Sequence, residues 1–458
     1  MDEKDQLKRT IGLGTAVILV IANMIGTGVF TTSGFIMQDL ANPASMLICW
    51  FIGGILALTG ALCYGELGAI FPKAGGEYIF LRESIGKPFG FLSGWVSLIV
   101  GFSAPIAAAS IAFSTYLYKS IGVESAGKEI LNIAGIITIS PVTLTGIAVI
   151  ILFSVVHWYS LNFGSNVQNL LTSFKILVIL AFIVLGLFIG KGSMENFSSG
   201  PVYTSLFTGK FATSLIFISF AYSGWNAAAY IGSEIKDPSR NIPLSLFWGT
   251  VIVMILYLLL NVIFIYALTI SEMSGVVEVG AKAAVSLFGV KTGSLFALAI
   301  TICLMSAISA MIMTGPRVYY AMARDHVFPQ WFGDVSPGHT TPGKAILLQS
   351  VIAIIMVVTS SFDKLLMYIG FTLSLFAMLT VLGLMILRLK NPGLERPYKT
   401  FGYPVTPVLF ILSSLWIIVY SIRDNPFVLL YGGGTIILGI IIYCYYTFKF
   451  KIFKDYKY

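Results

Sequence analysis

Two glycines interrupt a long apolar run in the stretch Asn23-Met24-Ile25-Gly26-Thr27-Gly28-Val29-Phe30. The run extends over residues 11–37, which is long enough for a helix that crosses a membrane. Glycine weakens a helix interior by up to about 1 kcal/mol relative to alanine. The stretch therefore predicts a helix that is broken near the middle of the membrane. A packing kink is the alternative, because glycine also lets membrane helices approach one another closely.

A second interruption lies in the sixth apolar run, over residues 211–234, and reads Phe220-Ala221-Tyr222-Ser223-Gly224-Trp225-Asn226. The first and sixth runs are the first members of two consecutive sets of five runs. Paired interruptions at corresponding positions of two repeats are the sequence signal of a transporter binding site. The two stretches together therefore indicate a site between two broken helices.

The composition of the chain indicates a membrane protein. Of its 458 residues, 57% are hydrophobic and 10% are charged, whereas an ordinary soluble domain carries about 25% charged residues. The 28 Lys and Arg residues form no basic stripe with interleaved aromatics, so no nucleic-acid partner is expected. The four cysteines lie in apolar runs and indicate neither a disulfide framework nor a metal site, and no cofactor is expected.

Apolar runs of about 20 residues predict twelve membrane-spanning helices in one all-α domain over residues 1–458. The predicted helices cover residues 11–37, 43–66, 89–118, 141–158, 166–190, 211–234, 242–270, 293–323, 343–361, 364–387, 403–422 and 427–448. An amphipathic stretch over residues 71–86 is expected in the membrane interface, and the loop over residues 273–290 is a further helical candidate.

The distribution of Lys and Arg predicts the orientation. An even number of helices places both termini on one side, and the loops on that side carry most of these residues. Cytoplasmic loops are enriched in Lys and Arg. Both termini are therefore expected in the cytoplasm, and the chain is expected in a plasma or inner membrane.

A broken membrane helix has a chemical consequence. Unwinding frees backbone N–H and C=O groups that lipid cannot satisfy, so these groups must face a cavity. The free N–H groups at the start of the second half-helix suit a carboxylate. The free carbonyls at the end of the first half-helix suit an ammonium group. A zwitterion carries both groups, so an amino acid fits such a site.

The motifs resemble those of the amino acid–polyamine–organocation (APC) transporters. The resemblance covers most of the chain and is closest to the L-type amino acid transporter branch and its bacterial relatives. It rests on Gly26-Thr27-Gly28-Val29-Phe30, Tyr64-Gly65-Glu66-Leu67-Gly68, Phe71-Pro72, Gly75-Gly76-Glu77-Tyr78, the stretch 220–226, Gly315-Pro316-Arg317 and Arg396-Pro397-Tyr398-Lys399. It implies a leucine-transporter-like fold, with a five-helix repeat over 11–190, an inverted second repeat over 211–387 and two extra helices over 403–448.

The resemblance also implies roles for individual residues. The backbone from Ile25 to Gly28 would hold the substrate carboxylate, the carbonyls of Met24 and of residues 220–222 would hold its amine, and Phe220 would be a gate over the substrate. The candidate substrate-binding residues are Met24, Ile25, Gly26, Thr27, Gly28, Phe220, Ala221, Tyr222, Ser223 and Asn226. L-type transporters pair with a heavy subunit through a cysteine between helices three and four. Residues 119–140 contain no cysteine, so no disulfide-linked heavy subunit is expected.

Lys175 lies near the middle of the predicted fifth helix. A charged residue at that depth costs at least about 2.5–3.5 kcal/mol on insertion scales, which favours a functional role over a lysine that snorkels to the surface. The run Val167-Gln168, Thr172 and Lys175 resembles the family pattern in which a lysine replaces a sodium ion. This implies sodium-independent coupling through Lys175, and leaves exchange and proton symport both open.

The absence of a carboxylate in the middle of any predicted helix favours a neutral L-amino acid as substrate. A cationic amino acid or polyamine antiporter is the alternative, as is a sensor that binds amino acids without transporting them. The parts of an intramembrane enzyme are not visible, so no enzyme activity is expected. Glu66, Glu234, Asp237 and Arg240 near the cytoplasmic helix ends are either ordinary interface charges or a gate network.

Overall fold

The computed structural model describes residues 8–133, 137–198, 209–276, 278–335, 341–359, 362–424 and 426–455. The tails 1–7 and 456–458 and the predicted helix boundary at 361 lie outside this part of the chain. The α-helices are α1 (Leu13–Met24), α2 (Gly28–Leu40), α3 (Pro43–Ile70), α4 (Glu77–Ser84), α5 (Lys87–Val96), α6 (Ala104–Ser120), α7 (Pro141–Tyr159), α8 (Leu161–Ile189), α9 (Gly209–Ala221), α10 (Ala227–Tyr230), α11 (Pro238–Ala267), α12 (Ile270–Met273), α13 (Val279–Phe288), α14 (Val290–Thr314), α15 (Pro316–Arg324), α16 (Gly343–Thr359), α17 (Phe362–Lys390), α18 (Val405–Asp424) and α19 (Phe427–Asp455).

Shorter elements connect these helices. The π-helical segment η2 (Ser97–Ser103) joins α5 to α6, and the 3-10 turns are η3 (Glu124–Gly127), η4 (Met194–Phe197) and η6 (Gln330–Gly333). The strands β1 (Leu131–Ile133) and β2 (Ile137–Ile139) form an antiparallel hairpin in which Leu131 pairs with Ile139.

Nine helices among the described residues are long and apolar enough to cross a membrane, and α1 with α2 makes a tenth if this bent pair is one span. The apolar helices α9 and α16 are shorter, at 13 and 17 residues. The chain is therefore an all-helical membrane protein with many spans. The count of twelve stays a prediction.

Helix α8 shows how the sequence separates the interior from the lipid-facing surface. Gln168, Thr172 and Lys175 follow one another at helical spacing and are buried, whereas Leu170 and Phe188 are 71% and 82% exposed. In water this distribution would be unfavourable, because apolar side chains cover the surface and polar ones lie inside. In lipid it is the expected arrangement, since intramembrane polar groups face the bundle interior.

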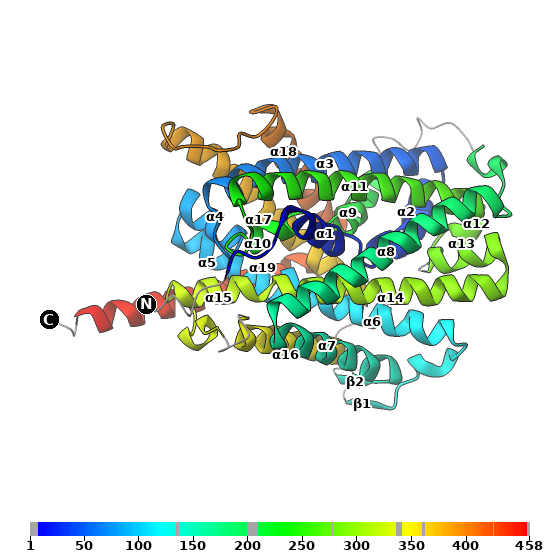
Figure 1. Cartoon of the computed structure of the whole chain (residues 1–458), viewed down its shortest axis with the longest axis horizontal. Helices are drawn as coiled ribbons and strands as arrows, with labels where there is room; N and C mark the ends of the chain where they lie inside the picture. The colour runs from blue at the N-terminus through cyan, green and yellow to red at the C-terminus, as the bar shows by residue number, and fades with distance from the viewer. Residues whose placement is uncertain are drawn as a thin grey trace.

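The broken helices lie in the middle of the bundle. Figure 1 shows α3 and α11 running side by side along the upper flank, with α1 below α11. Helix α1 packs against α11, α8 and α14, and α9 packs against α2, α3 and α18. The segments that the sequence marks as interrupted are thus surrounded by other helices.

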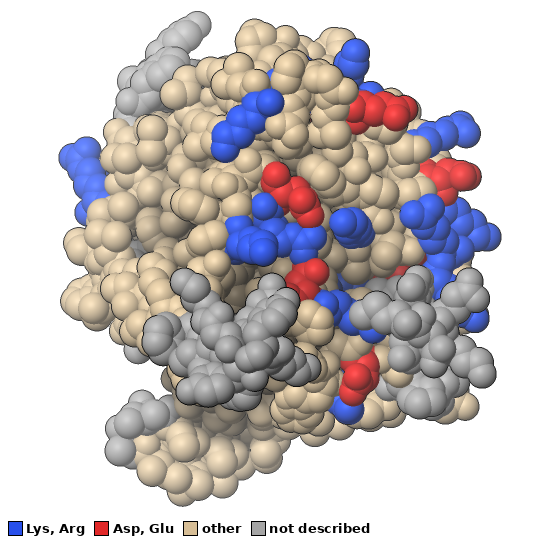
Figure 2. Space-filling model, turned by 90° about the vertical axis from the view of Figure 1, so that its left-hand side faces the viewer, with Lys and Arg blue, Asp and Glu red and all other residues tan. Residues whose placement is uncertain are grey.

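The chain enters α1 and leaves α19 at the same end of the bundle (Figure 1). Figure 2 views this end and shows Lys, Arg, Asp and Glu side chains gathered on it. Other charges form buried or partly buried ion pairs. Arg388 bonds Glu66 at 2.5 Å, and the buried Arg317 bonds the buried Glu234 at 2.8 Å. The orientation of this charged face relative to the membrane stays a prediction.

The stretch 71–86 is covered by other helices, and its position relative to the membrane interface stays a prediction. Its helix α4 packs against α5 and α17, and Glu77, Tyr78 and Phe80 are buried. Gly75 and Gly76 have φ angles of +117° and +52°, which L-residues with a side chain rarely adopt. They turn the chain inward, so the first residue of α4 enters the protein interior.

Candidate functional site

The first helix breaks at the predicted place. Helix α1 ends at Met24, the Gly26 amide donates to the Met24 carbonyl at 2.9 Å, and the chain bends by 42° before α2 begins at Gly28. The amides of Thr27 and Gly28 have no acceptor among the described residues. Free amides at a helix N-terminus are the groups that bind a carboxylate.

The sixth apolar run breaks at the predicted place as well. Helix α9 ends at Ala221, and the chain turns through Ser223 and Gly224 before the four-residue α10 begins at Ala227. The Ser223 amide donates to the Phe220 carbonyl at 3.0 Å. Gly224 has a φ of +94°, a left-handed conformation that favours glycine at this position.

The two breaks touch one another through their backbones. A Cβ atom added at Gly28 would lie 2.5 Å from the Cα of Ala221, and one added at Gly224 would lie 2.8 Å from the Asn23 carbonyl. Close packing therefore accounts for these two glycines. It does not account for Gly26, because a Cβ atom there would meet only the Ala307 Cβ, at an ordinary 3.8 Å.

The Tyr257 hydroxyl lies between the C-terminal ends of α1 and α9. The Tyr257 hydroxyl of α11 lies 2.7 Å from the Met24 carbonyl and 3.0 Å from the Ala221 carbonyl. A carbonyl oxygen has two lone pairs, so the Ala221 carbonyl keeps the capacity to accept one further hydrogen bond, whereas the Met24 carbonyl already accepts from Tyr257 and from the Gly26 amide. The Tyr257 hydroxyl thus brings together the Met24 and Ala221 carbonyls, which the sequence analysis expects near a substrate amine.

Lys175 reaches the first break from α8. Its ammonium donates to the Ala22 carbonyl at 3.3 Å and also to the Ile25 carbonyl. The side chain is fully buried, which argues against a lysine that snorkels to the membrane surface. A positive charge at the end of α1 stabilises the exposed carbonyls of a broken helix. The Lys175 ammonium group therefore braces the end of the first helix.

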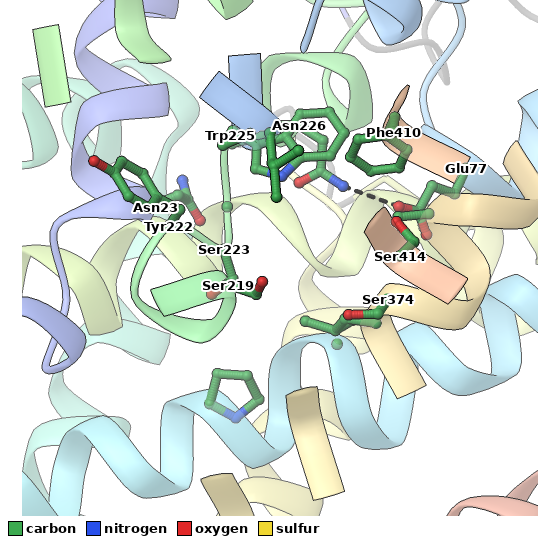
Figure 3. A pocket seen from close by; sticks show the side chains of 18 of the residues that line it. Asn23, Glu77, Ser219, Tyr222, Ser223, Trp225, Asn226, Ser374, Phe410 and Ser414 are labelled. Atoms are coloured by element: carbon green, nitrogen blue, oxygen red, sulfur yellow. Dashed lines mark hydrogen bonds between the residues drawn. The ribbon is translucent and has the colours of Figure 1, made fainter. Parts of the chain in front are cut away.

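A cavity of about 120 Å³ lies beside the second break (Figure 3). It is walled by α3, η2, α6, α17 and α18, and Asn23 reaches it from α1. The residues that line it from the second break are Ser219, Tyr222, Ser223, Gly224, Trp225, Asn226, Ala227 and Tyr230. Serine hydroxyls from α17 and α18 give the opposite wall polar groups.

The predicted site residues divide into two groups. Tyr222, Ser223 and Asn226 line the cavity. The residues that do not line it are Met24, Ile25, Gly26, Thr27, Gly28, Phe220, Ala221 and Lys175. Those of the first break nevertheless contact the second break directly, as Gly28 does with Ala221. Phe220, the predicted gate, is half-buried and lies outside the cavity lining.

Glu77 is a cavity residue to which the sequence analysis gave no role. Its side chain is 4% exposed and lines the cavity, and its Oε1 accepts from the Tyr64 hydroxyl at 2.7 Å and from the Asn226 amide at 3.0 Å. Figure 3 shows the Asn226 amide pointing at this carboxylate. The glycines at 75 and 76 were the signal in the sequence, because they let a loop turn inward.

Metal chemistry has no visible basis in the described residues. Among them, no group of three or more His, Cys, Asp and Glu side chains could hold a metal ion. The polar groups at the two breaks are backbone amides and carbonyls, hydroxyls, side-chain amides, the Glu77 carboxylate and the Lys175 ammonium group, which suit an organic ligand that forms hydrogen bonds.

Comparisons with known proteins agree with this geometry. A family model described as amino acid permease matches residues 11–444. The human large neutral amino acids transporter small subunit 2 is 27% identical over 463 residues, which cover 98% of this chain and 83% of that protein. The serine/threonine exchanger SteT of Bacillus subtilis is 31% identical over 419 residues, covering 91% and 92%. The human b(0,+)-type amino acid transporter 1 is 30% identical over 446 residues, covering 95% and 88%. These relatives are transporters, not enzymes.

Proposed function

Because this chain belongs to the amino acid permease family, we propose that it moves neutral L-amino acids across a cell membrane by exchange or proton symport, without sodium. The observation that carries the proposal is the backbone contact between the two helix breaks, at Gly28 and Ala221. Alternating access then exposes this site to one side of the membrane at a time, as in transporters with discontinuous helices.

The breaks supply complementary groups for a zwitterion. The amides of Thr27 and Gly28 would hold the carboxylate at the start of α2, where the helix dipole favours negative charge. The Ala221 carbonyl would hold the ammonium group, together with the Met24 carbonyl once the latter releases its bond from the Gly26 amide. The proposed substrate-binding set is Met24, Ile25, Gly26, Thr27, Gly28, Phe220, Ala221, Tyr222, Ser223 and Asn226, with Phe220 as a gate that moves over the substrate.

The cavity supports a neutral side chain, since its serine hydroxyls and aromatic rings offer hydrogen bonds and apolar contacts. The similar Bacillus subtilis protein is named as an exchanger for serine and threonine. Glu77 favours the second candidate, a cationic amino acid or polyamine antiporter, because a carboxylate in the cavity wall could face a positive side chain. The expectation of a neutral substrate rested on finding no such carboxylate in any helix centre.

Lys175 supports the sodium-independent part of the proposal. Its ammonium already occupies the carbonyls of Ala22 and Ile25, where a cation would otherwise be needed to offset the helix end. A fixed ammonium group serves exchange, and an ammonium group that loses its proton serves symport.

The finer architecture belongs to the same proposal. Twelve spans would form an inverted repeat of residues 11–190 and 211–387, followed by two extra helices over 403–448 in the single domain 1–458. Both termini would lie in the cytoplasm, on the charged end face of Figure 2. No disulfide-linked heavy subunit is proposed, because residues 119–140 lack cysteine.

Transport by the purified full-length chain in liposomes tests the function. Labelled serine, leucine and arginine are offered outside, with or without internal amino acid, sodium or a pH gradient. Serine or leucine uptake that needs internal amino acid supports exchange, and uptake driven by external acid supports symport. Uptake of arginine alone supports the second candidate. Sodium dependence contradicts the role of Lys175, and binding without any uptake indicates a sensor.

A further inference from the structure

Glu77 lies where a proton could reach it. It is the first residue of α4, its side chain lines the cavity beside Asn226, and Figure 3 shows the two side chains pointing toward one another. The glycine turn at 75 and 76 fixes this position, because a Cβ atom at Gly76 would lie 2.5 Å from the Tyr230 ring. The carboxyl group thus joins α4 to the broken α9–α10 segment.

All hydrogen-bond partners of the Glu77 carboxylate are neutral. Oε1 accepts from the Tyr64 hydroxyl of α3 and from the Asn226 amide, and the Tyr230 hydroxyl of α10 is a third donor. The Asn226 amide also lies 3.1 Å from the Tyr230 hydroxyl. The carboxylate therefore has three donors and no cation, so its negative charge is hydrogen-bonded but not neutralised.

No described group compensates this charge. None of the ion pairs among the described residues includes Glu77, and Arg82 of the same helix bonds Glu83 and Asp325. The titratable groups that face the carboxyl are the phenols of Tyr64 and Tyr230, and Tyr319 lies behind Tyr230. Burial raises the pKa of Glu77 to about 7, although the three hydrogen bonds lower it.

A purely structural role does not require an acid here. A glutamine amide oxygen could accept the same hydrogen bonds from Tyr64 and Asn226 without the cost of a buried charge. Of the two groups, only the carboxyl can bind and release a proton. Because Glu77 lies between the cavity and the second break, gain or loss of a proton there changes its hydrogen bond to Asn226.

We propose that Glu77 is a proton-binding group of the transport cycle, and that its protonation releases the Asn226 amide from α4. The inference rests on the transport function proposed above. The ionised carboxylate accepts three hydrogen bonds and ties the second break to α4. The protonated carboxyl is itself a donor and a weaker acceptor, so the bond that it accepts from the Asn226 Nδ2 group, which can only donate, weakens. The α9–α10 segment then moves more freely, and exchange becomes faster.

The pH dependence of exchange tests the proposal. For a group with a pKa of about 7, the protonated fraction rises about tenfold between about pH 8 and about pH 6. Liposomes with equal internal and external pH are therefore expected to exchange labelled serine or leucine several-fold faster at the lower pH. The variant Glu77→Gln should be nearly independent of pH. Wild-type exchange that is flat over this range, or a Glu77→Gln variant that keeps the wild-type slope, would overturn the proposal.

Two further variants sharpen the test. Tyr64→Phe removes a donor to the ionised carboxylate, which raises the pKa of Glu77, so the midpoint of the pH profile should move to higher pH. An unchanged or lowered midpoint would contradict the assignment. Glu83→Gln is the matched control, because Glu83 lies on the same helix, is partly exposed and bonds Arg82. It should keep the wild-type profile; a flat profile there would also count against Glu77.

A spectroscopic measurement separates this proposal from the transport function. Infrared difference spectra between acid and alkaline samples of the purified protein should contain the C=O stretching band of a protonated buried carboxyl. The band should be absent in Glu77→Gln and present in Glu83→Gln. An unaltered band in Glu77→Gln overturns the proposal even if exchange is normal. The spectra decide the protonation of Glu77 even if no amino acid is transported.

Discussion

Gly28 at the start of α2 lies against Ala221 at the end of α9, so close that a Cβ atom on Gly28 would be 2.5 Å from the Ala221 Cα. Two interruptions far apart in the sequence are therefore one structural unit. The amides at the start of α2 and the carbonyl end of α9 meet there. The site depends on this contact, which can be disturbed by a single methyl group.

Gly28→Ala should destabilise the protein, and Gly26→Ala should not. Overpacking typically costs about 1–3 kcal/mol, and the Ala221 backbone cannot move aside easily. At Gly26 the added methyl meets only the Ala307 Cβ at 3.8 Å, so the change in unfolding free energy should stay within about 0.5 kcal/mol. Thermal unfolding in detergent measures both. Equal losses in the two variants would contradict the packing account.

Tyr257→Phe should weaken substrate affinity together with stability. The variant removes the hydroxyl that lies between the Met24 and Ala221 carbonyls, at a cost of about 0.5–1.5 kcal/mol. Both half-helix ends should then be less well placed, so the apparent KM should rise.

Tyr118→Phe is the control for this variant, because its hydroxyl bonds Thr145 at 2.9 Å, between α6 and α7. Tyr118→Phe should lower the free energy of unfolding by a similar amount and leave the KM unchanged. If Tyr257→Phe keeps the wild-type KM, the hydroxyl does not position the site.

Lys175→Ala should slow transport by about tenfold or more, corresponding to about 1.4 kcal/mol, because hydrogen bonds of a charged group to the Ala22 and Ile25 carbonyls are lost. Initial exchange rates in liposomes over a range of pH give the measurement. Lys191→Ala, at an exposed position just after α8, should behave as wild type. Wild-type rates for Lys175→Ala at every pH would remove the proposed coupling role.

Phe220→Ala should raise the KM and shorten substrate retention if the ring closes over the bound amino acid. In this conformation Phe220 is half-buried and outside the cavity lining, so the gate has to move to act. Phe217→Ala is the control, since its ring stacks on Phe35 with centroids 5.8 Å apart, one helical turn away. Equal effects of the two variants would indicate lost packing instead of a lost gate.

Local sequence patterns predicted the breaks but not what surrounds them. Gly26, Gly28 and Gly224 are local signals, because glycine in an apolar helix is costly or conformationally special. The shared hydroxyl of Tyr257 and the serines of α17 and α18 carry no such signal. They reach the site through packing between distant helices, which a periodic pattern does not encode.

Glu77 is the part of the site that the sequence analysis did not predict. Hydropathy predicts residues 71–86 at the membrane interface, because the stretch is short and amphipathic. It does not show that two left-handed glycines turn the chain toward the protein interior and that α5 and α17 cover it. The expectation that no carboxylate faces the substrate region followed from that placement. Tertiary packing determines which residues of such a segment face the protein interior, and hydropathy alone does not predict it.

Competition against labelled amino acid uptake tests the central claim most directly. Unlabelled serine, N-acetylserine and serine methyl ester are compared as competitors in liposomes that contain the full-length protein. If the broken helices bind a zwitterion at their two backbone ends, serine competes strongly, and both derivatives, which each lack one charged group, compete at least about tenfold more weakly. Equal competition by all three compounds would contradict recognition of the carboxylate and the ammonium group at this site.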